Sequence, residues 1–229
     1  QQVNINNNNN NYNNTLTMVY IINYFPFGGR GELLRLIAEE GGIAYKSNYL
    51  SFADLAQQRA SFPYGQLPVL SEEGSDFQLA QTGAIARFLA KEAGLIPADA
   101  RQAALADSIT EGVAEFRAKA YSAFFKQGDQ EKQEALKKYR DSELKVVLTK
   151  FEGWLKKNGG QYFAGDKLSF ADLAVYDFLN ENQALINFAD EIPTLIALQK
   201  SVAARPNISA YSTSDRIKPS LGDNQKINE

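Results

Sequence analysis

Apolar and polar residues follow short, alternating elements over the first part of the chain and helical spacing over the rest. The β-branched and aromatic run 18–22 predicts a buried strand, and the apolar face of 32–40 predicts an amphipathic helix. A strand, a helix, a hairpin and a helix are expected next, at residues 44–50, 52–60, 68–79 and 81–93. The order β-α-β-α-β-β-α is typical of a sheet covered by helices.

From residue 97 onward the pattern is helical, and the last helix is expected to end before Arg205 and Pro206. Ser169 and Asp172 have the spacing of a capping box and predict a helix start. The chain is therefore expected to hold a small α/β domain and an all-α domain. The expected boundaries are 1–17 for a disordered Asn-rich tail, 18–95 for the α/β domain, 97–211 for the helical domain and 212–229 for a polar tail.

Composition changes the picture chiefly through two absences: the 229 residues include no cysteine and no histidine. A Ser-His-Asp triad, a cysteine nucleophile and a Cys/His zinc site are thereby excluded. Proton chemistry would have to use Tyr, Asp, Glu, Lys or Arg. Any reacting thiol would have to arrive with a ligand.

The net charge and the hydropathy of the chain limit the kinds of partner that we expect. The net charge of −3 is unlike the clustered basic surface of a nucleic-acid-binding protein, so no nucleic acid is expected. The sequence has no apolar run of the roughly 18 residues that a membrane span needs, so no membrane association is expected. The first residues have neither the basic start nor the apolar run of a secretion signal, which favours a cytoplasmic protein.

Three segments could carry chemistry. Residues 23–32, with Tyr24, Arg30 and three glycines, join the first strand to the first helix, where α/β sheets bind ligands and helices favour negative charge. Leu67-Pro68 opens a strand whose edge could pair with a peptide-like ligand. Thr82 is the expected N-cap of the next helix, a place for a carboxylate. Taken alone, the first segment can also be an ordinary turn, the second a loop proline and the third a simple helix cap, which is the favoured interpretation for Thr82.

Taken together, the motifs resemble those of the cytosolic glutathione S-transferases, over residues 18–211. Within that family the chain is most similar to the tyrosine-type classes, especially sigma. The motifs that carry the resemblance are Tyr24-Phe25, Gly29-Arg30-Gly31-Glu32, Arg35, Gly65-Gln66-Leu67-Pro68-Val69-Leu70, Gln81-Thr82-Gly83-Ala84-Ile85-Ala86-Arg87-Phe88-Leu89, Ala164-Gly165-Asp166-Lys167-Leu168-Ser169-Phe170-Ala171-Asp172 and Arg205-Pro206.

The resemblance implies a thioredoxin-like domain that binds glutathione, a helical domain that supplies the pocket for a hydrophobic electrophile, a homodimer and a cis bond at Leu67–Pro68. It implies no metal. Tyr24 falls on the catalytic tyrosine, whose hydroxyl stabilises the glutathione thiolate, and Arg30 on an active-site arginine. The other positions implied to bind glutathione are Arg59, Gly65, Gln66, Leu67, Gln81, Thr82 and Glu115, the last in the neighbouring subunit's site.

The chain departs from the family pattern at four positions. Leu55 replaces a usual tryptophan, Gln66 a common lysine and Thr82 the usual serine, while Gly28 stands where some classes carry a second arginine. Conjugation of glutathione to hydrophobic electrophiles is the expected function, as in detoxification. Leu55 keeps open a glutathione-binding ligandin or structural protein with little activity. A glutathione-dependent prostaglandin isomerase is the other alternative.

Overall fold

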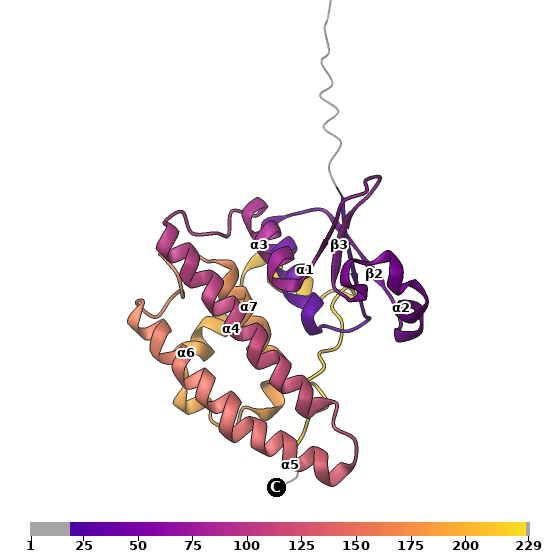
Figure 1. Cartoon of the computed structure of the whole chain (residues 1–229). Coiled ribbons are helices and arrows are strands. Elements are labelled where there is room, and N and C mark those ends of the chain that lie inside the picture. Colours follow the sequence, from indigo (N-terminus) through magenta and orange to yellow (C-terminus); the bar gives the residue numbers. More distant parts are fainter. Residues whose placement is uncertain (1–18, 228–229) are drawn as a thin grey trace, which may run out of the picture.

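The computed structural model describes residues 19–227. The expected Asn-rich tail 1–17 lies outside the described residues. The first part of the chain folds into a four-stranded mixed sheet with helices, and the rest into a helical bundle (Figure 1). This arrangement confirms the expected thioredoxin-like α/β domain followed by an all-α domain.

The sheet has the strand order β2-β1-β3-β4, with β1 parallel to β2 and antiparallel to β3. Helices α1 and α3 lie together between the sheet and the helical bundle, and α2 lies on the other side of the sheet (Figure 1). The elements of this part are β1 (Tyr20–Tyr24), α1 (Gly29–Gly41), β2 (Tyr45–Tyr49), α2 (Phe52–Gln58), the short helical turns Arg59–Ser61 and Pro63–Gly65, β3 (Val69–Glu72), β4 (Gln78–Ala80) and α3 (Thr82–Glu92).

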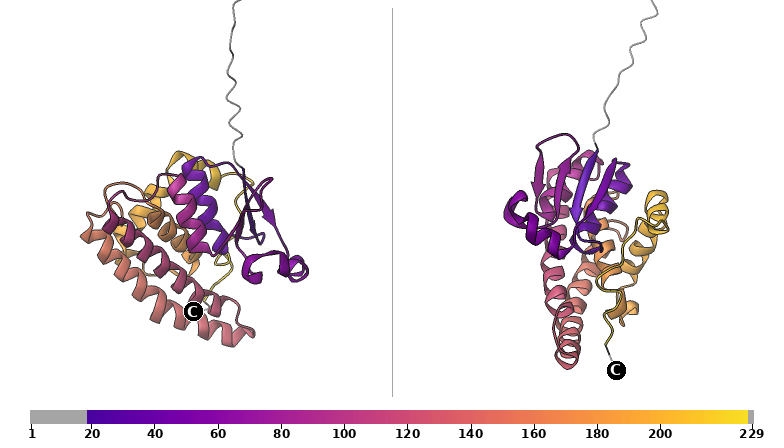
Figure 2. Two further views of the ribbon diagram at one scale, coloured as in Figure 1. Left: turned by 45° about the horizontal axis from the view of Figure 1, so that its top comes forward. Right: turned by 90° about the vertical axis from the view of Figure 1, so that its right-hand side faces the viewer.

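The bundle is built around α7, whose residues are almost all buried between α4, α8 and α1 (Figure 2). The predicted capping box at its start is present, since Ser169 and Asp172 each bind the other's backbone N–H. The elements are α4 (Ala100–Phe124), α5 (Asp129–Tyr139), a π-helical turn (Arg140–Leu144), α6 (Lys145–Lys157), α7 (Phe170–Glu181), the turns Gln183–Leu185 and Ala189–Glu191, α8 (Pro193–Ala203) and α9 (Pro206–Ser212).

Two predictions are wrong in ways that bear on function: where the first helix begins, and that no helix follows Arg205 and Pro206. Helix α1 begins at Gly29 rather than at residue 32, so Arg30 and Gly31 belong to its first turn. Helix α8 ends at Ala203 as expected, but Pro206 then opens α9, because proline is well tolerated in the first turn of a helix. Helix α9 packs against α1 and directs the C-terminal residues back toward the sheet.

The described part of the chain contains no helix with the length and hydrophobicity needed to cross a bilayer.

Candidate functional site

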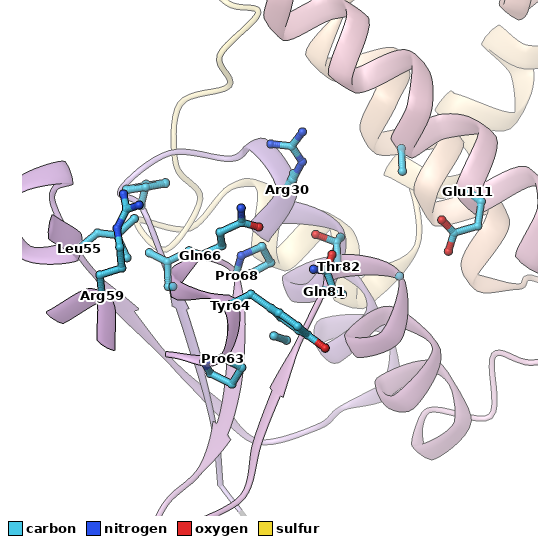
Figure 3. A pocket seen from close by; sticks show the side chains of 16 residues that line it. Arg30, Leu55, Arg59, Pro63, Tyr64, Gln66, Pro68, Gln81, Thr82 and Glu111 are labelled. Carbon is cyan, nitrogen blue, oxygen red and sulfur yellow. The ribbon is translucent and has the colours of Figure 1, made fainter. Parts of the chain in front are cut away.

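A cavity of about 550 Å³ lies where the ends of the strands meet the start of α3 and one face of α4 (Figure 3). Its walls come from both domains: the sheet domain supplies most of them, and α4 closes the remaining side. The lining residues are Phe25, Arg30, Leu55, Arg59, Pro63, Tyr64, Gly65, Gln66, Leu67, Pro68, Ala80, Gln81, Thr82, Gly83, Glu111 and Ala114.

Seven of the nine predicted site residues border this cavity: Arg30, Arg59, Gly65, Gln66, Leu67, Gln81 and Thr82. Tyr24 does not border it, although its neighbour Phe25 and Arg30 do. Glu115 does not border it either. Figure 3 shows Arg30 on one side, Leu55 and Arg59 on another, and Gln81 and Thr82 facing Glu111. The separate motifs therefore line one cavity. Segments that served only as turns or helix caps would not need to lie together in this way.

Tyr24 ends strand β1 and lies against the first turn of α1. Its ring is buried, and its hydroxyl oxygen accepts a hydrogen bond of 3.0 Å from the backbone N–H of Arg30. Two glycines make this approach possible, because a Cβ on Gly29 would lie 2.8 Å from the hydroxyl and one on Gly31 would lie 2.5 Å from the ring. The hydroxyl uses a lone pair in this bond and keeps its own proton for donation.

Burial raises the pKa of the Tyr24 hydroxyl above its usual value. The Arg30 N–H, the Arg30 charge and the more distant Arg117 oppose that rise, and Glu181 adds to it. Tyr24 is therefore a neutral phenol at physiological pH. A neutral phenol at the positive end of a helix can donate a hydrogen bond to an anion.

Gly31→Ala is expected to lower the free energy of unfolding by about 1–3 kcal/mol, because the added methyl group overpacks the Tyr24 ring. Urea denaturation followed by circular dichroism measures this change. Gly112→Ala is the matched control, since its Cβ in α4 would meet only Phe151 at an ordinary 3.9 Å. Equal stability of the two variants would contradict the close packing of Tyr24 on α1.

Two residues that line the cavity, Leu67 and Gln81, have uncommon backbone features. The Leu67–Pro68 bond is cis, which confirms the expectation from the resemblance. Gln81, with φ of 75°, adopts a left-handed conformation that is rare for a residue other than glycine. It is the N-cap of α3, so the prediction that Thr82 caps this helix is wrong; Thr82 is its first residue. Unusual backbone conformations of this kind gather at functional sites.

The acidic residue at the cavity is Glu111, which lies one helical turn before Glu115 on α4. The Glu111 carboxylate lies over Gly83 at the start of α3, in space that a Cβ at this position would share. Glu115 is 67% exposed in its side chain and forms an ion pair of 3.3 Å with Lys119. The role predicted for Glu115 belongs to a neighbouring subunit's site and stays a prediction. The four-residue spacing of acids on this helix was the available signal for Glu111.

A buried ionic network in the helical domain lies next to the site. Arg117 donates to Asp177 and to Glu181, both at 2.6 Å, and the Tyr121 hydroxyl donates to Glu181 at 2.9 Å. The Arg30 guanidinium lies 5.0 Å from the centre of the Tyr121 ring, as in a cation–π contact. Sequence reasoning missed Arg117, because one basic residue on a long helix carries no sign of burial.

The cavity combines two guanidinium groups, one carboxylate, amide and hydroxyl groups and the N-terminus of α3. Such a set suits a small zwitterion with more than one carboxylate, since the arginines and the helix start attract anions and Glu111 attracts an ammonium group. Among the described residues, no group of three or more acidic side chains is placed to hold a metal ion.

Comparisons with known proteins agree with this geometry. Residues 114–215 match the family model described as glutathione S-transferase, C-terminal domain. The chain is 34% identical to glutathione S-transferase P of Bos taurus, with 85% of this chain and 92% of that protein covered, and 31% identical to glutathione S-transferase 1 of Ascaris suum, with 82% and 97% covered.

Solved structures show the same likeness. A glutathione S-transferase from Ascaris lumbricoides superposes with a TM-score of 0.73 at 32% identity, covering 84% of this chain and 95% of that one. Prostaglandin synthase D of Nilaparvata lugens superposes with a TM-score of 0.77 at 27% identity, covering 86% and 98%. The chain therefore belongs to the glutathione S-transferase family, whose members use glutathione as co-substrate.

Proposed function

We propose that this glutathione transferase joins the sulfur of glutathione to hydrophobic electrophiles, and that the Tyr24 hydroxyl stabilises the reacting thiolate. The observation that carries the proposal is the hydrogen bond from the Arg30 N–H to the Tyr24 oxygen. This bond holds the hydroxyl next to the backbone of Arg30, a residue that lines the cavity, and leaves the hydroxyl proton free. The sulfur would enter between the side chains of Phe25 and Arg30 to meet that proton.

The chemistry requires a lower thiol pKa, because the thiolate is the nucleophile and a free thiol, with a pKa near 8.5, is only a few per cent ionised at neutral pH. Lowering that pKa by about two units needs roughly 2.7 kcal/mol. One hydrogen bond to the charged sulfur contributes about 1.5–3 kcal/mol. The positive charge of Arg30 and the N-terminus of α1 act in the same direction.

The remaining lining fits the rest of the tripeptide. We assign the glycine carboxylate to Arg59 and the γ-glutamyl carboxylate to Thr82 and Gln81 at the start of α3. Gln66, Gly65 and the main chain of Leu67 would pair with the peptide backbone. We assign the γ-glutamyl ammonium group to Glu111 of the same chain, whose presence in the cavity lining supports this role. The aliphatic Leu55 offers packing but no hydrogen bond at this wall.

Turnover of a chloronitrobenzene substrate, measured with calorimetric binding of S-methylglutathione, tests the proposed function. We expect saturable conjugation and binding of the analogue. Binding without turnover against several electrophiles would replace the proposal with the ligandin alternative that Leu55 keeps open. Absence of binding would show that the cavity is not a glutathione site.

A second candidate function is a glutathione-dependent prostaglandin isomerase, which the likeness to the prostaglandin synthase D structure favours. An isomerase would release glutathione unchanged, whereas a transferase consumes it. Product analysis with a prostaglandin endoperoxide, together with measurement of glutathione consumption, separates the two. The electrophile itself stays open in both cases.

We also propose that the protein works as a homodimer in the cytoplasm, as the family resemblance implies. Tyr64, which borders the cavity and is 77% exposed, supports a partner on this side of the molecule. The sigma-class assignment stays a prediction, because a P-type bovine enzyme and a nematode enzyme are similar to this chain to nearly the same degree.

A further inference from the structure

The C-terminal residues 213–227 form a defined segment that crosses the start of α1. Figure 1 shows it in yellow, running from α9 past the end of the sheet and down toward α5. Its charged side chains bind the sheet domain, where Arg216 pairs with Glu39 and Lys218 lies 5.2 Å from the centre of the Tyr49 ring. Its far end is held by Gln133 of α5, which donates to the Lys226 carbonyl at 2.9 Å. The polar composition of this segment gave no indication that it packs on the fold.

One contact connects this segment to the proposed site. The backbone N–H of Gly28 donates to the Pro219 carbonyl at 2.9 Å. Gly28 is the N-cap of α1 and has no side chain with which to cap the helix, while its carbonyl accepts from Gly31 and Glu32. Arg30, whose N–H holds the Tyr24 hydroxyl, lies in the same turn. The segment therefore anchors the residue on which that turn is built.

This anchor matters because three glycines at the start of α1 do little by themselves to restrict the backbone of that turn. Gly28, Gly29 and Gly31 lie in and beside its first turn, and glycine loses more conformational freedom on ordering than any other residue. The first backbone N–H groups of a helix have no partner within the helix. An external acceptor at Gly28 limits the movement of the Arg30 N–H and hence of the Tyr24 hydroxyl.

The segment lies directly against the backbone at the end of α7, whose last residue, Glu181, belongs to the buried ionic network. A Cβ on Gly222 would coincide with the carbonyl oxygen of Glu181, whose carboxylate binds Arg117 and Tyr121. The adjoining turn is closed by the Ser220 N–H, which donates to Asp223 at 2.8 Å. Gln225 is buried and donates to the Leu221 carbonyl at 3.0 Å. The close approach at Gly222 thus determines where Pro219 can lie.

We propose that residues 215–227 are a positioning element of the active site, which holds the N-cap of α1 through Pro219 and so keeps the Tyr24 hydroxyl aligned with the glutathione sulfur. This inference rests on the proposed function of Tyr24. It assigns to Gly222 and Pro219 an effect on the ionisation of glutathione, although neither lines the cavity.

The test compares Gly222→Ala with Gly153→Ala, whose Cβ on the exposed side of α6 would meet no atom within 4 Å. For Gly222→Ala we expect the pH profile of kcat/KM to shift to higher pH by about one unit, which is a tenfold loss of thiolate at neutral pH. The KM for glutathione should change less than about twofold, and Gly153→Ala should keep the parent profile. A fall in melting temperature with an unchanged pH profile would overturn the proposal, because a merely structural segment predicts that result.

A chain ending at Ser214 provides the second variant, and hydrogen exchange of the amides of residues 28–31 provides a readout that needs no activity. We expect these amides to exchange at least about tenfold faster in the shortened chain, since their anchor is lost. Unchanged exchange would overturn the inference even if the enzyme is active. If exchange is faster in the shortened chain but the full-length parent protein shows no turnover, the proposed function is contradicted and the anchor is still supported.

Discussion

Tyr24→Phe is expected to lower kcat/KM for glutathione conjugation by about 10- to 100-fold, which corresponds to the roughly 1.5–3 kcal/mol of a hydrogen bond to a charged group. The substitution removes only the hydroxyl. The ring contacts with Phe25 and Phe27, whose centres lie 5.3 and 5.6 Å from that of Tyr24, are kept. Steady-state kinetics with a chloronitrobenzene substrate measures the loss, and binding of S-methylglutathione should persist because this analogue has no thiol to ionise.

Tyr20→Phe is the matched control for this experiment. Tyr20 lies on the same strand, is equally buried in its ring and donates its hydroxyl proton to Glu92 at 2.7 Å, away from the cavity. Its removal should leave kcat/KM within about twofold of the parent value. Equal activities of the Tyr24 and Tyr20 variants would remove Tyr24 from the mechanism.

Arg117→Met is expected to lower the free energy of unfolding by about 3–5 kcal/mol, the largest stability effect that the structure predicts. Arg117 is 2% exposed and pairs with both Asp177 and Glu181. Methionine keeps most of the volume but leaves two carboxylates buried without their cation. Thermal and urea unfolding measure the loss, with Arg87→Met as control, since Arg87 pairs with Asp107 and Glu111 and each of these exposed pairings contributes no more than about 1 kcal/mol.

The pH dependence of this variant follows from the same network. Burial raises the pKa of Asp177, and Glu181 adds to the rise while Arg117 opposes it. Without Arg117 the folded-state pKa rises further above the unfolded value. A carboxyl group whose pKa is higher in the folded than in the unfolded state contributes stability at low pH, and this contribution is lost as the pH rises through the folded-state pKa. Arg117→Met should therefore be less destabilising in mild acid than above neutral pH, and a pH-independent loss would contradict the pairing.

Much of the fold could be predicted because local signals agreed with one another. The β-branched run before Tyr24 and the capping box at Ser169 and Asp172 each specify an element without reference to distant residues. The first turn of α1 was missed because Gly29 and Gly31 have poor helix propensity. They are present because Tyr24 needs the space that a side chain would fill.

Much of the lining of the cavity could be predicted from the sequence, but its geometry could not. The motif resemblance pointed to Arg30, Arg59 and Gln66, which border the cavity. Periodicity alone could not say which acidic turn of α4 faces α3, because residues four apart share one helix face. In the structure Glu111 is the acidic residue of α4 that borders the cavity, and Gly83 leaves room for its carboxylate.

The docking of the C-terminal segment was not predictable from its composition. Two of the features that position it are the bond from Gly28 to the Pro219 carbonyl and the close approach that the missing side chain of Gly222 allows. Neither feature can be recognised in a pattern of apolar and polar residues, because each depends on contact with a residue that is distant in the sequence. A polar, proline- and glycine-containing end therefore has the same sequence signature whether it is free or packed.

The central claim, that the Tyr24 hydroxyl stabilises the glutathione thiolate, is tested most directly by titrating bound glutathione through the ultraviolet absorbance of its thiolate. The parent protein is predicted to ionise the thiol about two pKa units below the value near 8.5 of a free thiol, and Tyr24→Phe to bring it back by at least one unit. Equal thiol pKa values in the two bound forms would contradict the claim.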